Sequence, residues 1–338
     1  MKLAIRLIVL SAFAMVLAAP HASAQSLSYT KGQNVSPAFE GWEEDANGAK
    51  YFLFGYMNRN WEEELNVPVG TDNNIAPGNP DQGQPTHFLP RRNRFVFRVA
   101  VPKSFTEKDE MVWTLTTYGK SEKAYATLRT DYNVDNTVKQ SETGALGAGT
   151  SSPEVRANQP PVAKVEGSKQ LSAKVGQPIT LTMLVTDDGV PKARGAGLAG
   201  AAVSNTGSRQ DTARDSSAGP GADSAVRRNR EMLPPQRATV GKNVGLHLSW
   251  FVYRGAGKVT FDPEQIKAWE DTRTGANSPW SPIWTAPEMP KDGKVVVHAT
   301  FSDPGIYTLR GVADDGGLTG YDDVIVTVTG NSSTSRQN

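Results

Sequence analysis

The chain has 338 residues, with 36 Lys and Arg against 35 Asp and Glu, and it has no cysteine. Its formal net charge of +1 gives no electrostatic reason to expect nucleic acid or an anionic membrane as a partner. Without cysteine, disulfides, thiolate nucleophiles and cysteine-based zinc sites are excluded, so the folded chain must be stabilised by packed cores.

The first 24 residues have the pattern of a secretory signal peptide. Lys2 and Arg6 form a basic start, residues 7–18 are apolar, and residues 22–24 supply small side chains for cleavage. The apolar run is shorter than the ~20 residues that a membrane-spanning helix needs. An uncleaved N-terminal anchor is the alternative. We expect an exported protein, periplasmic or extracellular, with no membrane span after the signal is removed.

Residues 25–140 read as an N-terminal β domain that resembles no known family. In residues 93–101, Phe95, Phe97 and Val99 point one way while Arg94 and Arg98 point the other, which is the period of a half-buried strand. The same alternation predicts strands at 51–58, 110–118 and 124–134.

A linker is predicted at residues 141–160, which are small, polar and rich in Pro and Gly. A second β domain follows at 161–330, and residues 331–338 form a tail. Alternating apolar residues predict its strands at 179–186, 246–253, 295–301, 305–313 and 323–329. The predicted fold class is all-β, with two β-sandwich domains.

Two segments interrupt this pattern. Residues 191–243 contain no aromatic residue and are rich in Ala, Gly, Ser and Arg, so they are predicted to form a disordered insertion in one loop. A short helix is predicted after Asp262, with Pro263 at its first position and Gln265 completing the cap. Ile266 and Trp269 would share one face of that helix.

The second domain resembles an immunoglobulin-like sandwich of bacterial envelope proteins, close to the polycystic-kidney-disease and cadherin-like repeats. The resemblance rests on Asn158-Gln159-Pro160-Pro161-Val162-Ala163, on Asp303-Pro304-Gly305-Ile306-Tyr307-Thr308-Leu309 and on Ala313-Asp314-Asp315-Gly316-Gly317. It implies a buried Trp250 on the third strand and a tyrosine corner at Tyr307, with Leu309 where other members carry a cysteine. The Trp-x-Phe-Gly-Asp-Gly signature of the kidney-disease type is absent.

Two acidic turns end predicted strands. Asp187-Asp188-Gly189 follows one strand, and Asp314-Asp315-Gly316 follows another. If these are the second and sixth strands of the sandwich, the turns meet at one pole, where four carboxylates could bind Ca²⁺. Alternatively, Asp-Gly is simply turn chemistry. No other cofactor is expected.

A tryptophan cluster gives a second candidate site. Trp269, Trp280 and Trp284 lie in a Pro-rich connection, where exposed aromatic rings could stack on a sugar or anchor a protein partner. The alternative is that they cover the core beneath an irregular connection.

Catalytic patterns are weak. His87 is expected in a loop, and His247 and His298 on the outer face or edge of strands, with no Gly-x-Ser-x-Gly elbow nearby. Acidic runs at 43–44, 62–64 and 270–271 could supply a glycosidase pair but are typical of solvated surface. Arg91, Arg92 and Arg94 could bind an anion or face solvent.

These observations favour an exported, non-catalytic binding or structural module of the cell envelope, with an envelope protein or a carbohydrate as its partner. The alternative is an envelope hydrolase or its carbohydrate-binding accessory protein.

Overall fold

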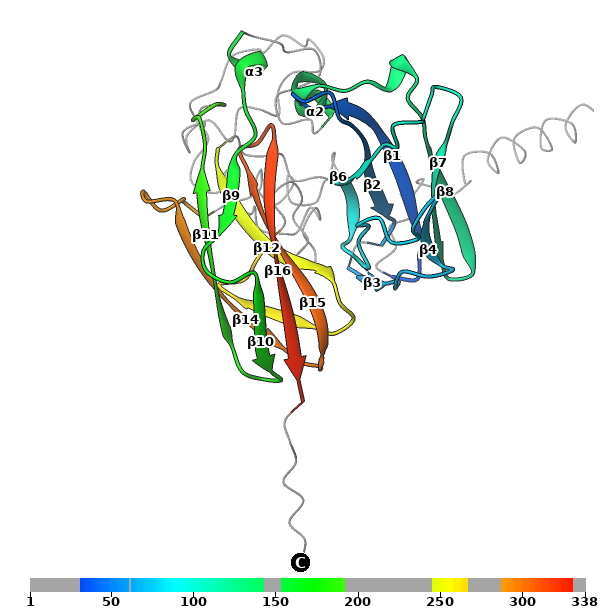
Figure 1. The fold of residues 1–338 in the computed structure, drawn as a ribbon. Helices are drawn as coiled ribbons and strands as arrows, with labels where there is room; N and C mark the ends of the chain where they lie inside the picture. The colour runs from blue at the N-terminus through cyan, green and yellow to red at the C-terminus, as the bar shows by residue number, and fades with distance from the viewer. Residues whose placement is uncertain (1–30, 61, 143–152, 192–244, 267–286, 331–338) are drawn as a thin grey trace, which may run out of the picture.

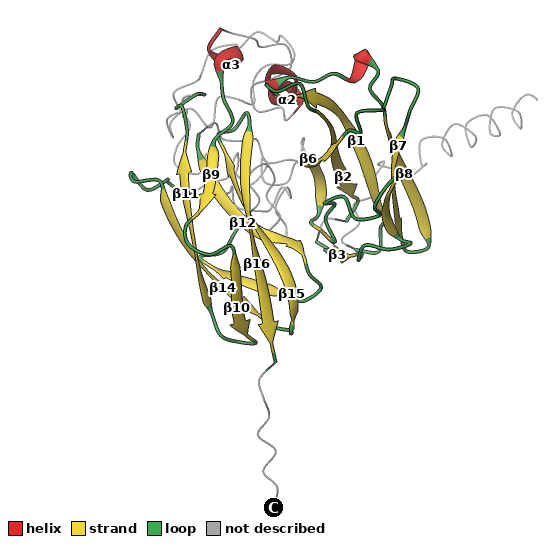
Figure 2. Ribbon diagram, viewed as in Figure 1, coloured by secondary structure: helices red, strands yellow, loops and turns green. Residues whose placement is uncertain are grey.

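The computed structural model describes residues 31–60, 62–142, 153–191, 245–266 and 287–330 (Figure 1). These residues form two β-sandwiches that lie side by side, and Figure 2 shows how little of the structure is helical. The first sandwich contains β1 (Val35–Glu44), β2 (Lys50–Asn58), β3 (Leu65–Asn66), β4 (Asn73–Ala76), β5 (His87–Phe88), β6 (Arg91–Ala100), β7 (Met111–Thr117) and β8 (Lys120–Ala126). The second contains β9 (Val162–Val165), β10 (Gln170–Lys174), β11 (Ile179–Thr186), β12 (His247–Arg254), β13 (Val259–Asp262), β14 (Lys294–Phe301), β15 (Gly305–Asp314) and β16 (Thr319–Thr329).

The first sandwich packs the sheet β1-β2-β6 over the sheet β4-β7-β8, with the two-stranded β3-β5 sheet beside them. Met111, Trp113 and Leu115 are fully buried, as their alternation predicts. Phe54 stacks on Phe97 with 5.4 Å between ring centroids. Trp113 meets both rings edge-on, so aromatic pairs from both sheets form the centre of this core.

Two strand predictions in this domain need correction. The pairing of β2 with β6 shifts register after Phe54, and Phe95 has a positive φ of 51°. This irregularity displaces Phe95, which is only half-buried although Phe97 and Val99 are buried. The strand expected at 124–134 ends at Ala126, and a short 3₁₀ helix, η1 (Thr130–Tyr132), follows it.

The second sandwich has the immunoglobulin-like strand arrangement. One sheet has the order β13-β14-β11-β9 and the other β10-β16-β15-β12. The first strand is split between the sheets, because β9 pairs antiparallel with β11 while β10 pairs parallel with β16. Leu181, Met183 and Val185 are buried as predicted, so β11 and β15 are the second and sixth strands of an immunoglobulin-like fold.

Both landmarks of the resemblance are present. Trp250, on the third strand, is 1% exposed. The Tyr307 hydroxyl donates a hydrogen bond to the Asp303 carbonyl at 2.9 Å, which is the geometry of a tyrosine corner. Leu309 is fully buried, so an aliphatic side chain fills the place of the usual disulfide.

The outer face of β12 is buried, contrary to its pattern. His247 lies on the edge strand as expected, yet only 3% of it is exposed, and its Nδ1 lies 2.9 Å from the Gly245 carbonyl oxygen. Ser249 donates to the carbonyl of Ile266. Tyr253 packs into the core of the first sandwich. This strand is therefore covered on both faces, which local alternation does not reveal.

The helix predicted after Asp262 does not begin in the described residues. Asp262 is the last residue of β13 and pairs with His298, and residues 263–266 are not helical. The side chain of Gln265 accepts a hydrogen bond from the backbone N–H of Trp250 at 2.9 Å. Gln265 thus provides an acceptor for a backbone N–H of the edge strand β12 instead of capping a helix. Trp269 lies outside the described residues.

Between the sandwiches, α2 (Asn136–Glu142) and α3 (Pro153–Ala157) occupy part of the stretch that composition marks as a linker. The predicted signal peptide, residues 192–243 of the predicted insertion and the predicted C-terminal tail lie outside the described residues. None of the helices that the structure describes is long and apolar enough to cross a membrane.

Candidate functional site

The two acidic turns meet at one pole of the second sandwich. β11 and β15 run in the same direction, and the turns that follow them both contact residues 158–159. The backbone N–H of Gln159 donates to Asp188 Oδ2 at 3.0 Å, and Asn158 Nδ2 donates to Asp315 Oδ2 at 3.1 Å. The predicted convergence of the turns is therefore present, with the start of β9 between them.

Each of the four aspartates accepts a hydrogen bond from a backbone N–H of its own turn. Asp187 Oδ2 accepts from the Gly189 N–H at 2.9 Å, and Asp188 Oδ1 accepts from the Val190 N–H at 2.9 Å. Asp314 Oδ1 accepts from Gly316, and Asp315 Oδ1 accepts from Gly317 and Leu318. These bonds are the turn chemistry that the sequence left open as an alternative to metal binding.

The four carboxyl groups differ in how deeply they are buried. Asp314 and Asp315 are almost fully buried, and desolvation raises the pKa of Asp315 to about 6 despite the hydrogen bonds it accepts. Desolvation also raises the pKa of Asp187, and its Oδ1 has no hydrogen-bond partner among the described residues. Asp188 remains exposed.

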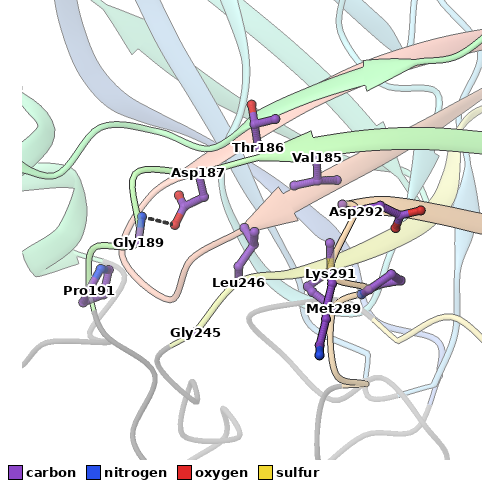
Figure 3. A pocket seen from close by; sticks show the side chains of 12 residues that line it. Val185, Thr186, Asp187, Gly189, Pro191, Gly245, Leu246, Met289, Lys291 and Asp292 are labelled. Atoms are coloured by element: carbon purple, nitrogen blue, oxygen red, sulfur yellow. Dashed lines mark hydrogen bonds between the residues drawn. The ribbon is translucent and has the colours of Figure 1, made fainter.

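A groove of about 510 Å³ opens beside Asp187 (Figure 3). Its walls are the end of β11, the residues that lead into β12 and the residues that lead into β14. The lining residues are Val185, Thr186, Asp187, Gly189, Pro191, Gly245, Leu246, Met289, Pro290, Lys291, Asp292 and Gly293. Leu246 and Met289 supply apolar surface, while Asp187, Lys291 and Asp292 supply charge.

No group of three or more acidic or histidine side chains within the described ranges could hold a metal ion. A calcium ion at this pole would need backbone oxygens and water in addition to the aspartates. Calcium binding by Asp187, Asp188, Asp314 and Asp315 therefore stays a prediction. The tryptophan site is untested because Trp269, Trp280 and Trp284 lie outside the described residues.

A second polar centre joins the two sandwiches, and the sequence patterns miss it. Arg310 is 5% exposed, and its guanidinium lies between the rings of Tyr253 and Tyr321, 3.6 and 3.8 Å from their centroids. Its Nε and Nη2 donate to the two carboxylate oxygens of Asp323 at 2.7 and 2.8 Å. Its Nη1 donates to the Val96 carbonyl of the first sandwich at 2.7 Å.

Arg310 stays charged although its side chain is buried in this contact. Burial alone would lower the pKa of Arg310, but the hydrogen bonds that it donates to Asp323 and the surrounding charges hold that pKa above its ordinary value. One signal in the sequence could have revealed it, since Arg310 is the one charged residue in the otherwise apolar stretch from Leu309 to Ala313.

Residues 253–256 dock on the loop before β5. The Thr86 N–H donates to the Tyr253 carbonyl at 3.2 Å, and the Tyr253 hydroxyl donates to the Gly83 carbonyl. Arg254 forms a fork with Asp81 at 2.7 and 3.0 Å. We call the contact formed by Asn66, residues 81–87, Val96, residues 253–256 and Arg310 the joint.

His87 and the arginines expected to bind anions have structural partners. His87 lies in β5 instead of a loop, is 6% exposed, and contacts Glu64 and Asn66. Arg92 pairs with the buried Glu40 at 2.7 Å, and Arg94 lies 3.9 Å from the same carboxylate. An internal carboxylate thus occupies the place where an external anion was considered.

No family model and no curated protein matches this chain. Among solved structures, a conjugative transposon lipoprotein from Bacteroides eggerthii DSM 20697 is 9% identical, with 49% of this chain and 96% of that chain covered and a TM-score of 0.23. The D00-D0 domain of intimin is 10% identical, over 87% of this chain and all of that one, with a TM-score of 0.21. The titin Ig tandem A164-A165 is 7% identical, over 88% and 100%, with a TM-score of 0.19. Identities this low show the fold alone, and TM-scores this low carry no argument about function.

Proposed function

We propose that this protein is an exported, non-catalytic binding module of the cell envelope, and that its ligand contacts the groove at the acidic pole. The observation that carries the proposal is the groove itself. It lies at the end of an immunoglobulin-like sandwich where the β11–β12 and β13–β14 connections meet. Loops gathered at one end of such a sandwich are the usual binding surface of this architecture.

The chemistry of the groove fits an envelope protein better than a small substrate. Its lining combines the apolar side chains of Leu246 and Met289 with the charges of Asp187, Lys291 and Asp292 (Figure 3). Apolar surface next to charged side chains is typical of a protein interface. The polycystic-kidney-disease or cadherin-like subtype of the second domain belongs to the same proposal.

Non-catalytic action is supported by how the reactive side chains are used. His87 and Arg310 take part in the joint, and Asp315 accepts three hydrogen bonds at a turn. The alternative, an envelope hydrolase or its carbohydrate-binding accessory, is favoured only by the apolar and charged mixture of the groove. It predicts binding of cell-wall glycans instead of protein.

The test has two parts. Fractionation of cells that make the full chain should recover a product cleaved after Ala24 in the envelope fraction. The mature chain should then retain a defined set of envelope proteins, and Leu246→Asp should reduce that retention at least tenfold. A matched change at the opposite pole, Lys174→Glu, should leave it unchanged.

Retention that is equal for the wild type and Leu246→Asp would overturn the groove as the binding site. Retention of cell-wall glycans without protein, or hydrolysis of them, would support the alternative function.

A further inference from the structure

The ring of His87 lies inside the joint and faces two hydrogen-bonding groups. Its Nδ1 is 2.8 Å from Asn66 Oδ1, and its Nε2 is 3.0 Å from Glu64 Oε2. His87 is 6% exposed whereas the Glu64 side chain is 49% exposed, so water reaches the Glu64 carboxylate but has little access to the ring itself. The protonation state of the ring therefore decides whether both contacts are favourable.

Both facing groups are acceptors. An ionised carboxylate such as that of Glu64 only accepts hydrogen bonds. The amide of Asn66 is oriented by the second sandwich, because its Nδ2 donates to the Ala256 carbonyl at 3.2 Å. Reversing that amide would place its oxygen against the Ala256 oxygen, so Oδ1 is the atom that faces His87.

Only the imidazolium form of His87 donates from both nitrogens. A neutral ring keeps one N–H, and its other nitrogen then turns a lone pair toward an acceptor oxygen. The carboxylate of Glu64 is the stronger acceptor and keeps the remaining N–H, so the contact with Asn66 becomes unfavourable on deprotonation. Because Asn66 also donates to the Ala256 carbonyl, this loss reaches the joint.

The charged neighbours of His87 act in both directions. The Glu64 carboxylate at 3.0 Å favours the imidazolium. Arg94 and Arg310 line the same small cavity from β6 and β15 and oppose it, but Arg94 lies 3.9 Å from Glu40 and Arg310 is paired with Asp323. Asp81 and Arg254 likewise neutralise each other in their fork. Tyr56, Tyr253 and Tyr321 also line the cavity, and tyrosines stay neutral over the pH range in which histidine titrates.

We propose that protonation of His87 controls the strength of the contact between the two sandwiches. The charged ring donates to both Glu64 and Asn66 and stabilises the joint, whereas the neutral ring weakens it. An exported protein meets the pH of its surroundings directly, so acidification would stiffen the two-domain unit and alkaline conditions would release it. This inference is independent of the groove and of any ligand there, since it concerns only the coupling between the domains.

The first test is nuclear magnetic resonance of the histidine ring nitrogens in the mature wild-type chain, from pH 5.5 to 8. At pH 5.5 both nitrogens of His87 should show the shifts of protonated nitrogen. As the pH rises, the Thr86 and Gly255 amide signals should change with the midpoint of the His87 ring, because both amides donate across the joint. A neutral His87 ring at pH 5.5, or amide signals that ignore its titration, would overturn the proposal.

The second test is urea unfolding at pH 6.5 and pH 8. The midpoint should fall with rising pH in the wild type and in His298→Gln, a control that removes an exposed histidine. The fall should vanish in His87→Gln. It should also vanish in Glu64→Gln, because the new amide can donate to the neutral ring nitrogen. An unchanged fall in both of these variants would contradict the proposal.

Discussion

The guanidinium of Arg310 stacks on the ring of Tyr253 with 3.6 Å between its Cζ and the ring centroid. Both residues belong to the second sandwich, yet both reach the first. Arg310 donates to the Val96 carbonyl, and Tyr253 packs with the aromatic core of the first sandwich. This stacked pair therefore contacts both sandwiches, through a hydrogen bond from Arg310 and through the packing of Tyr253.

Replacing Arg310 by alanine should destabilise the chain by about 3–5 kcal/mol, because it leaves Asp323 without its buried partner and removes the bond to the first sandwich. Urea unfolding of the purified chain measures the loss. The control is Lys294→Ala, which breaks an exposed pair with Glu166 and should change stability far less. Equal effects in the two variants would mean that Arg310 is an ordinary surface charge.

Replacing Tyr253 by alanine should weaken the first sandwich although the residue lies in the second. The ring is 4% exposed and belongs to the first core, so we expect a loss of about 3–5 kcal/mol. Hydrogen exchange should show reduced protection in β2 and β7. Tyr125→Ala, at an exposed ring, should change stability by less than about 0.5 kcal/mol. Loss of protection in β15 and β16 alone would contradict the assignment of Tyr253 to the first core.

At the centre of the second sandwich, Trp250→Ala should cost roughly 3–5 kcal/mol because it leaves a large cavity. Trp250→Phe should cost much less, since the indole Nε1 has no hydrogen-bond partner among the described residues and its loss removes a buried unsatisfied donor. Thermal and urea unfolding distinguish the two variants. An alanine variant as stable as the parent would reject the strand register.

Asp315 should make the chain less stable as pH rises from about 4 to about 6. Burial raises the pKa of Asp315 to about 6, whereas in the unfolded chain it titrates at about 3.9. Between these values the folded state holds the proton and the unfolded state does not, so the contribution of Asp315 to the free energy of unfolding falls with pH and changes no further above about 6. The upper bound of this loss is roughly 3 kcal/mol.

Asp315→Asn should remove that part of the pH dependence in urea unfolding measured at pH 4, 5 and 6. Asp131→Asn, at an exposed carboxyl, should keep it. A fall in stability that persists unchanged in Asp315→Asn would assign it to other groups.

Calcium at the acidic pole is tested by thermal unfolding in about 1 mM Ca²⁺ and in excess chelator. A cation bound only by the folded state raises the melting temperature by mass action. We expect a calcium-dependent rise that is absent in the double variant Asp187→Asn/Asp314→Asn. Identical curves with calcium and with chelator would leave these carboxylates as turn residues only.

Much of the fold follows from local pattern. Leu181, Met183 and Val185 in β11, and Met111, Trp113 and Leu115 in β7, are buried because alternate residues of a strand face one side of a sheet. The acidic turns, the tyrosine corner at Tyr307 and the buried Trp250 follow from residue type and position along the chain. Each of these features depends on neighbours that are close in sequence or on a strand order shared by many sandwiches.

Tertiary contacts decided the rest. Ser249 and Tyr253 occupy outward-facing positions of β12, and they are buried only because residues 263–266 and the first sandwich cover that face. Arg310 and His87 acquire their partners only in the completed fold, where Asp323 of the neighbouring strand β16 lies against Arg310, and Glu64 and Asn66 lie against His87. Alternation determines which side of a strand a residue faces, whereas burial and protonation depend on what the completed fold packs against that side.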